Sequence, residues 1–161
     1  MKNENPFRYS DDNKRYHTLN YYNKTGFAGK VFKAVIDAGF TCPNKDGTKG
    51  TGGCIYCMGG SGYFTEKSDG EIYDSVKRQL AAEKERIYKK HPDSLITAYF
   101  QANTNTYAPV ATLKEAYTAA LDFGVHGISI GTRADCLPDD VIALLCDINS
   151  KSHLTVELGL Q

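Results

Sequence analysis

The sequence predicts an α/β fold with about four parallel strands, because strand-like runs alternate along the chain with amphipathic segments. Short runs rich in β-branched and aromatic residues predict strands at 31–36, 95–100, 127–131 and 154–158. Apolar residues at helical spacing predict helices at 68–90, 112–124 and 137–148. Strands joined by right-handed helical crossovers form a parallel sheet, so one sheet with helices packed on it is expected.

Local signals mark the ends of these helices. Ser68 with Glu71, and Thr112 with Glu115, have the spacing of a capping box, which predicts N-caps at Ser68 and Thr112. Gly124 is expected to end the second helix.

The chain divides into two expected regions. Residues 1–30 are polar and aromatic and predict an extended or irregular leader with at most a short helical turn. Residues 31–161 hold the alternating elements and stop directly after the fourth strand, which leaves a sheet edge uncovered. We therefore expect 31–161 to be the N-terminal part of a longer (β/α) barrel; the alternative is a complete four-stranded α/β domain.

Composition and charge narrow the class of protein. The 161 residues are 41% hydrophobic and carry a formal net charge of zero, so no overall field attracts nucleic acid or a membrane surface. The N-terminus lacks an apolar signal-peptide core, and no run of about 18 apolar residues exists, so a cytoplasmic location is expected. The five cysteines of the chain are therefore expected to be metal ligands, catalytic groups or buried thiols, with Cys146 packed as a small apolar group.

Three cysteines lie in a glycine-rich loop after the first strand. Cys42, Cys54 and Cys57 form a C-x11-C-x2-C pattern, and seven glycines between 41 and 63 argue against regular structure there. This spacing fits a three-thiolate iron–sulfur site, a zinc site with a fourth ligand such as Cys136, Cys146 or a histidine, or a redox pair. Residues 43–53 are expected to depend on the metal for their order.

Residues 42–57 resemble the cluster loop of the YtqA/YhcC-type radical S-adenosylmethionine (SAM) proteins, relatives of the Elongator catalytic subunit. Further segments that resemble this family are 15–22, 100–109, 129–140 and 156–161. One departure is Ala134, where the family usually has proline.

The resemblance implies a partial, TIM-barrel-like fold of radical SAM type. It implies a [4Fe–4S] cluster on Cys42, Cys54 and Cys57, with SAM bound at the fourth iron and cleaved to a 5′-deoxyadenosyl radical. The implied cofactor-binding residues are Tyr56, Gln101, Asn103, Thr104, Arg133 and Glu157; no residue is assigned a catalytic role.

Simpler roles remain open for several of these side chains. Asn103 and Thr104 also fit turn capping, and Arg133 also fits a structural pair with Asp135. Glu157 lies inside a strand, where an unpaired carboxylate is costly to bury, so a polar partner is expected.

The resemblance also implies a substrate class and partners. Relatives act in tRNA wobble-uridine modification, which makes tRNA the expected substrate, and a flavodoxin or ferredoxin the expected electron donor. The alternatives are a non-catalytic zinc-binding module and an iron–sulfur electron-transfer protein.

Overall fold

The computed structural model describes residues 7, 10, 14–55, 57 and 68–159. In chain order the elements are α1 (Leu19–Phe27), β1 (Val31–Ile36), α2 (Ile72–Tyr88), β2 (Leu95–Phe100), α3 (Val110–Phe123), β3 (Gly127–Arg133), a 3-10 turn (Ala134–Cys136), α4 (Asp139–Lys151) and β4 (His153–Gly159). None of the helices in these ranges is long and apolar enough to cross a membrane.

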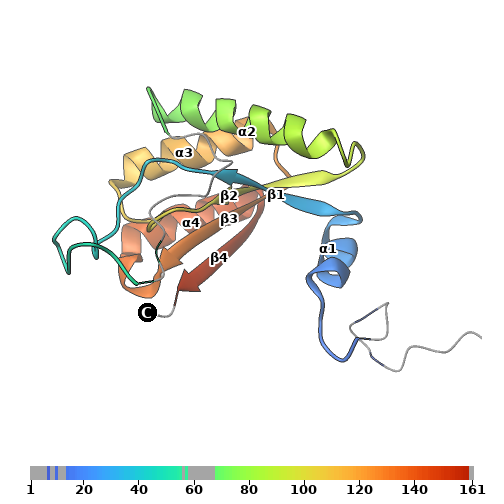
Figure 1. Cartoon of the computed structure of the whole chain (residues 1–161), viewed down its shortest axis with the longest axis horizontal. Coiled ribbons are helices and arrows are strands. Elements are labelled where there is room, and N and C mark those ends of the chain that lie inside the picture. Colours follow the sequence, from blue (N-terminus) through green and yellow to red (C-terminus); the bar gives the residue numbers. More distant parts are fainter. Residues whose placement is uncertain (1–6, 8–9, 11–13, 56, 58–67, 160–161) are drawn as a thin grey trace, which may run out of the picture.

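The four strands form one parallel sheet in the order β1-β2-β3-β4 (Figure 1). The predicted alternation of strands and helices and the parallel sheet are thus confirmed. Because each strand lies beside the next one along the chain, every right-handed crossover runs in the same direction and places its helix on the same face. Figure 1 shows α2, α3 and α4 together on that face.

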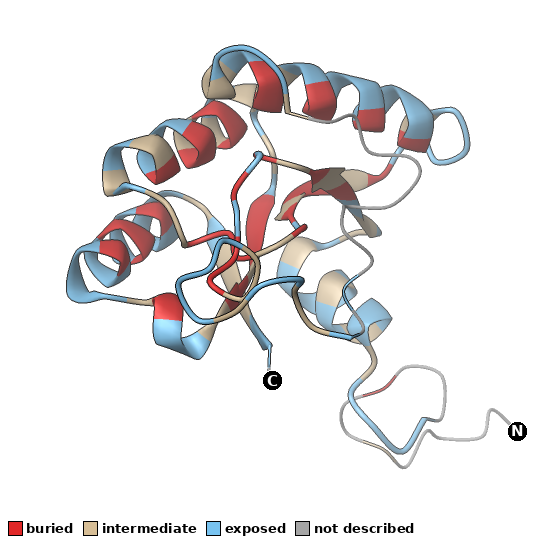
Figure 2. Ribbon diagram, turned by 60° about the vertical axis from the view of Figure 1, so that its left-hand side comes forward, coloured by how far each residue is buried: buried red, intermediate tan, exposed pale blue. Residues whose placement is uncertain are grey.

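The two faces of the sheet differ in chemistry because alternate side chains point to opposite sides. The face under α2, α3 and α4 is apolar and fully buried, as the red bands in Figure 2 show. Its strand residues include Ala34, Ile36, Ile96, Ala98, Phe100, Ile128 and Ile130. The opposite face, called the open face below, carries Lys33, Thr97, Tyr99, Ser129, Thr155 and Glu157.

The predicted starts of α2 and α3 are each wrong by three residues, in opposite directions. The N-cap of α2 is Glu71 rather than Ser68, and that of α3 is Pro109 rather than Thr112. Proline tolerates a helix start, since its missing N–H has no partner there in any helix, and the Pro109 carbonyl accepts the amides of Thr112 and Leu113. Gly124, with φ +83°, ends α3 as predicted.

The predicted leader contains a nine-residue helix, α1, where only a short helical turn was expected. Thr18 caps it by accepting a hydrogen bond from the Tyr21 amide at 3.1 Å. No residue of α1 is buried, and its few apolar side chains, Leu19, Tyr22 and Phe27, stand among polar residues, which is a weak signal for a helix. It contacts the start of β4, where the Tyr22 hydroxyl lies 2.9 Å from His153 Nε2 and the Phe27 ring packs edge-on against the same imidazole.

A buried glutamine joins α2 to the end of β1. Gln79 is 1% exposed, and its amide accepts from the Asp37 N–H at 2.9 Å and donates to the Asp37 carbonyl at 2.8 Å. These bonds satisfy the backbone where β1 leaves the sheet and enters the cysteine loop.

We expect Gln79→Met to lower the free energy of unfolding by about 2 kcal/mol, because it keeps the side-chain volume and leaves two backbone groups of Asp37 without partners. Urea unfolding followed by circular dichroism measures this change. Lys77→Met, a partly exposed position on the same helix, is the matched control and should change stability by less than about 0.5 kcal/mol. Equal effects of the two substitutions would contradict the role given to Gln79.

Candidate functional site

A cavity of about 460 Å³ opens at the carboxyl ends of the four strands. It is called the thiol cavity here, because the cysteine loop after β1 forms one of its walls. Of the site residues predicted from the sequence, those that line it are Cys42, Cys54, Cys57, Gln101, Asn103, Thr104, Arg133 and Glu157. Tyr56, the remaining predicted residue, lies outside the described residues. Segments distant in the sequence therefore converge at the edge of the sheet where α/β proteins bind ligands.

The cysteine loop holds its shape through its own backbone hydrogen bonds. The amides of Lys45 and Lys49 donate to the carbonyls of Cys42 and Pro43, both at 2.8 Å, and Gly53 donates to Asn44 at 2.9 Å. Gly52 and Gly53 have φ of +85° and +78°, a conformation that other residues rarely adopt, which explains part of the glycine content. These bonds give residues 43–53 a defined backbone, and the expectation that this loop depends on a metal for its order stays a prediction.

Residues after β2 tie this loop to the sheet. The Asn103 side chain donates to the Phe40 carbonyl at 2.8 Å and accepts from Lys45 Nζ at 2.6 Å. The Thr104 amide donates to the Thr41 carbonyl at 3.1 Å. Asn103 thus uses both ends of its amide to hold the protein's own chain, whereas Gln101 is exposed at the cavity.

The three thiols of the loop differ in exposure. Cys42 is buried, Cys54 is partly buried and accepts a hydrogen bond from the Asn44 amide at 3.3 Å, and Cys57 is exposed. In the described ranges, no three Cys, His, Asp or Glu side chains are close enough to one another to hold a metal ion. The Cys57 amide donates to the Cys54 carbonyl at 2.8 Å, so these two cysteines share one tight turn.

The donor set of the thiol cavity is three thiols, which are the ligand type of iron–sulfur clusters. N–H groups donating to sulfur, as Asn44 does to Cys54, tune such sites. A structural zinc site needs a fourth ligand, and among the described lining residues there is no fourth cysteine and no histidine.

The two remaining cysteines lie elsewhere. Cys136 is buried and lines a separate cavity of about 720 Å³, between the N-terminal ends of α3 and α4. Cys146 is exposed on α4, so the prediction that it packs as a small apolar group is wrong.

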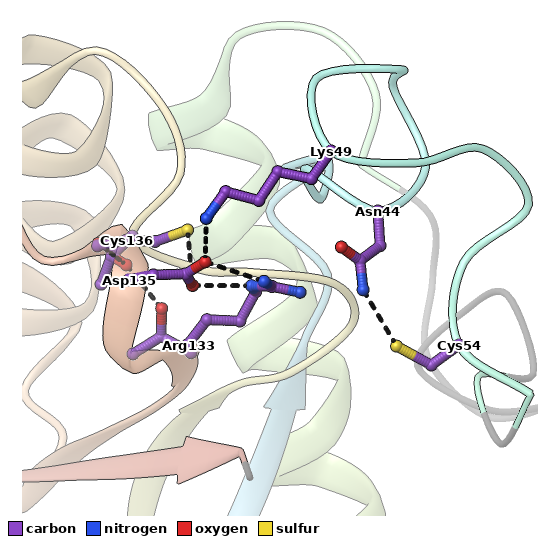
Figure 3. A network of polar contacts seen from close by, with 8 residues as sticks. Asn44, Lys49, Cys54, Arg133, Asp135 and Cys136 are labelled. Carbon is purple, nitrogen blue, oxygen red and sulfur yellow. Dashed lines mark hydrogen bonds and ion pairs between the residues drawn. The ribbon is translucent and has the colours of Figure 1, made fainter. Parts of the chain in front are cut away.

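An ion-pair network joins the cysteine loop to the end of β3 (Figure 3). Arg133 donates from Nε and Nη2 to the two Asp135 carboxylate oxygens, both at 2.8 Å, and Lys49 pairs with the same carboxylate. The hydrogen bonds from Arg133 and then Lys49 hold the pKa of Asp135 well below its usual value. The same bonds with Asp135 raise the pKa of Arg133.

One nitrogen of Arg133 remains without a partner. Its Nη1 atom is buried and makes no hydrogen bond among the described residues, and in Figure 3 it points to the side of Asn44 and Cys54. The bidentate edge of the guanidinium is therefore engaged by Asp135, while the two N–H groups of Nη1 have no partner among the described residues beside the thiol cavity. Such donors suit an anionic or carbonyl oxygen of a ligand.

Glu157 lies at the floor of the thiol cavity, and it has the polar partners expected from the sequence. Its carboxylate contacts Lys33 Nζ and the Tyr99 hydroxyl, from β1 and β2. Sequence reasoning missed Lys33, Lys45, Lys49 and Tyr99. The one available signal was Lys33, a charge inside an otherwise apolar strand.

Comparison with curated proteins finds relatives along nearly the whole chain. It is 49% identical over 163 residues, 100% of the chain, to the uncharacterized protein YtqA of Bacillus subtilis (strain 168). It is 37% identical over 137 residues (84% of the chain) to protein YhcC of Escherichia coli (strain K12), and 35% identical over 147 residues (87%) to the uncharacterized protein MJ0486 of Methanocaldococcus jannaschii.

These matches cover 49%, 42% and 42% of the three relatives, so the chain spans about half the length of the curated relatives it matches. No family model matches the chain, and no solved structure matches it significantly.

Proposed function

We propose that this chain carries the cluster-bearing part of a radical SAM enzyme, a partial (β/α) barrel in which Cys42, Cys54 and Cys57 hold a [4Fe–4S] cluster. The observation that carries the proposal is the convergence of the three thiols with Gln101, Asn103, Thr104, Arg133 and Glu157 on one cavity at the carboxyl ends of the strands. An isolated CxxC turn would not share a cavity with polar side chains from three other segments of the chain.

Three thiolates leave one iron of a cubane without a protein ligand, and this iron is the place for a small chelating ligand. When bound, the cluster supplies the electron that cleaves the sulfonium of SAM. The protein's own part is to fix Cys42 through the hydrogen-bonded loop, to donate from Arg133 Nη1 to an oxygen of the ligand, and to accept hydrogen bonds at Glu157.

The substrate and partners belong to the same proposal. By its resemblance to relatives of the Elongator catalytic subunit, the whole protein acts on tRNA, at a wobble uridine, in the cytoplasm. A flavodoxin or ferredoxin then delivers the electron. Because the curated relatives are about twice as long, residues outside this chain contribute to these steps in our proposal.

Anaerobic reconstitution with iron and sulfide tests the cluster. We expect a brown protein with about four irons per chain, whose EPR signal after reduction changes when SAM is added. Cys54→Ala should abolish the cluster spectrum, because a cubane with two protein thiolates loses its anchor. Cys146→Ala, at an exposed cysteine on α4, is the matched control and should leave iron content unchanged.

Two other results of the reconstitution would each indicate a different class of protein. A colourless chain with one bound zinc would overturn the proposal in favour of a zinc-binding module. A cluster whose EPR signal does not change when SAM is added would favour an iron–sulfur electron-transfer protein.

Asn103→Gly tests how the loop supports the cluster. Asn103 has φ +60°, which glycine adopts without strain, so this change removes only the two side-chain hydrogen bonds to Phe40 and Lys45. We expect the reconstituted cluster to be lost to a chelator about thirty times faster, since two bonds of about 1 kcal/mol each restrain the loop. The decay of the cluster absorbance measures the rate.

Asn149→Ala, at an exposed asparagine of α4, is the control and should decay like the unmodified chain. Equal decay rates for Asn103→Gly and the unmodified chain would mean that the loop needs no support from β2.

A further inference from the structure

Three strands bring a lysine, a tyrosine and a glutamate together on the open face of the sheet. Lys33 Nζ lies 2.5 Å from Glu157 Oε1, and the Tyr99 hydroxyl donates to Glu157 Oε2 at 3.0 Å. The Lys33 ammonium also lies 3.8 Å from the centroid of the Tyr99 ring, within the range of a cation–π contact. Each of the three side chains thus contacts the other two.

The register of the sheet makes this cluster possible. β3 separates β2 from β4, and its residues at this level are small: Ser129 pairs with Tyr99, and Gly131 pairs with Glu157. A large side chain at either position would stand between the tyrosine and the carboxylate. The hydrogen bond from Tyr99 to Glu157 therefore crosses an intervening strand because that strand leaves room.

The cluster lies between two cavities. Tyr99 and Glu157 line the thiol cavity, while Lys33 and Glu157 line a smaller cavity of about 160 Å³ that α1 covers with Leu19, Tyr22 and Phe27. Glu157 is common to both. The three side chains thus form the floor of the thiol cavity and separate it from the space under α1.

Fold stability does not account for this arrangement. The side chains of Lys33 and Glu157 are 39% and 38% exposed, and ion pairs this exposed contribute little to the free energy of unfolding. Their geometry instead determines what the floor presents to a ligand. Burial and then the Glu157 carboxylate raise the pKa of Tyr99 to about 12, so the phenol stays a protonated donor at neutral pH.

The positive charge of the Lys33 ammonium offsets the negative charge of the Glu157 carboxylate, so the floor of the thiol cavity carries no net charge. A carboxylate has about four acceptor positions, and Lys33 and Tyr99 occupy two of them. The remaining positions are available to hydrogen-bond donors of a ligand.

We propose that Lys33 and Tyr99 are positioning residues that fix the Glu157 carboxylate and cancel its charge, so that the floor of the thiol cavity accepts hydrogen bonds from a neutral polar group rather than binding a cation. The proposed function enters only in naming SAM as the ligand used in the second experiment below.

The first experiment uses the full chain without any cofactor. With tyrosine labelled at ¹³Cζ, the NMR shift of Tyr99 at neutral pH reports whether its hydroxyl donates to a carboxylate. Glu157→Gln removes the carboxylate and defines the shifted position. We expect Lys33→Met to move the Tyr99 resonance toward that position, because the carboxylate loses its anchor, whereas Lys33→Arg should keep the original shift.

Lys77→Met is the matched control, since Lys77 also lies over a tyrosine ring, that of Tyr73 at 5.1 Å, on helix α2. It should leave the Tyr99 resonance in place. An unchanged Tyr99 shift in Lys33→Met would show that Lys33 does not hold the carboxylate and would overturn the proposal.

The second experiment measures the Kd of SAM on the reconstituted protein. We expect Lys33→Met to weaken binding about tenfold, Lys33→Arg to restore most of it, and Lys33→Met with Glu157→Gln to bind no worse than Glu157→Gln alone. Tighter binding by Lys33→Met would mean that the bare carboxylate attracts the cationic part of SAM, against the proposal. If the unmodified chain binds no SAM, the proposed function fails, and the NMR result alone decides the role of Lys33.

Discussion

The constraint on which the rest of the structure depends is the single direction of its three crossovers. Because β1 to β4 follow one another across the sheet, α2, α3 and α4 all cover one face, and the other face is left for polar side chains. Every strand also ends at the same edge, so the segments after β1, β2 and β3 meet there. A thiol loop, a polar turn and an arginine are therefore neighbours although some 90 residues separate Cys42 from Arg133.

Along that edge of the sheet, the cysteine loop is organised by hydrogen bonds within the protein. Its backbone hydrogen bonds are internal, and Asn103 and Lys45 attach it to the turn after β2. Cys42 is the thiol that this network fixes, whereas Cys57 is exposed and the three thiols are not yet close enough to hold one ion.

Much of the fold could be predicted from the sequence because its signals are local. Val31–Ile36 and Leu95–Phe100 are apolar runs that fit a strand covered by helices, and Gly124 marks a helix end through its left-handed backbone. The sequence offers two start signals for α3, Pro109 and the capping-box pattern at Thr112. The prediction used Thr112, whereas the helix begins directly after Pro109. Helix α1 was expected only as a short turn, because Leu19, Tyr22 and Phe27 are few apolar residues among polar ones and mark a helix face weakly.

The site itself was predictable only as far as the order of elements determines it. The carboxyl ends of parallel strands must lie together, which explains why the predicted residues share one cavity. Which charges pair there depends on register and side-chain reach, and no local pattern contains that information. Lys33 reaches Glu157 across two other strands because Ser129 and Gly131 are small, and Lys49 reaches Asp135 because the loop folds back over β3.

The resulting charge pattern gives the two ends of the thiol cavity different hydrogen-bonding groups. Lys33 offsets Glu157 at the floor, and Asp135 engages two nitrogens of Arg133 near the mouth, which leaves Nη1 as the buried donor without a protein partner in the described ranges. An acceptor group of a ligand is therefore favoured beside the thiols, and a donor group at the floor. A ligand that carries both, in that order, satisfies the cavity in one orientation only, so the polar groups of the protein select a pose as well as a compound.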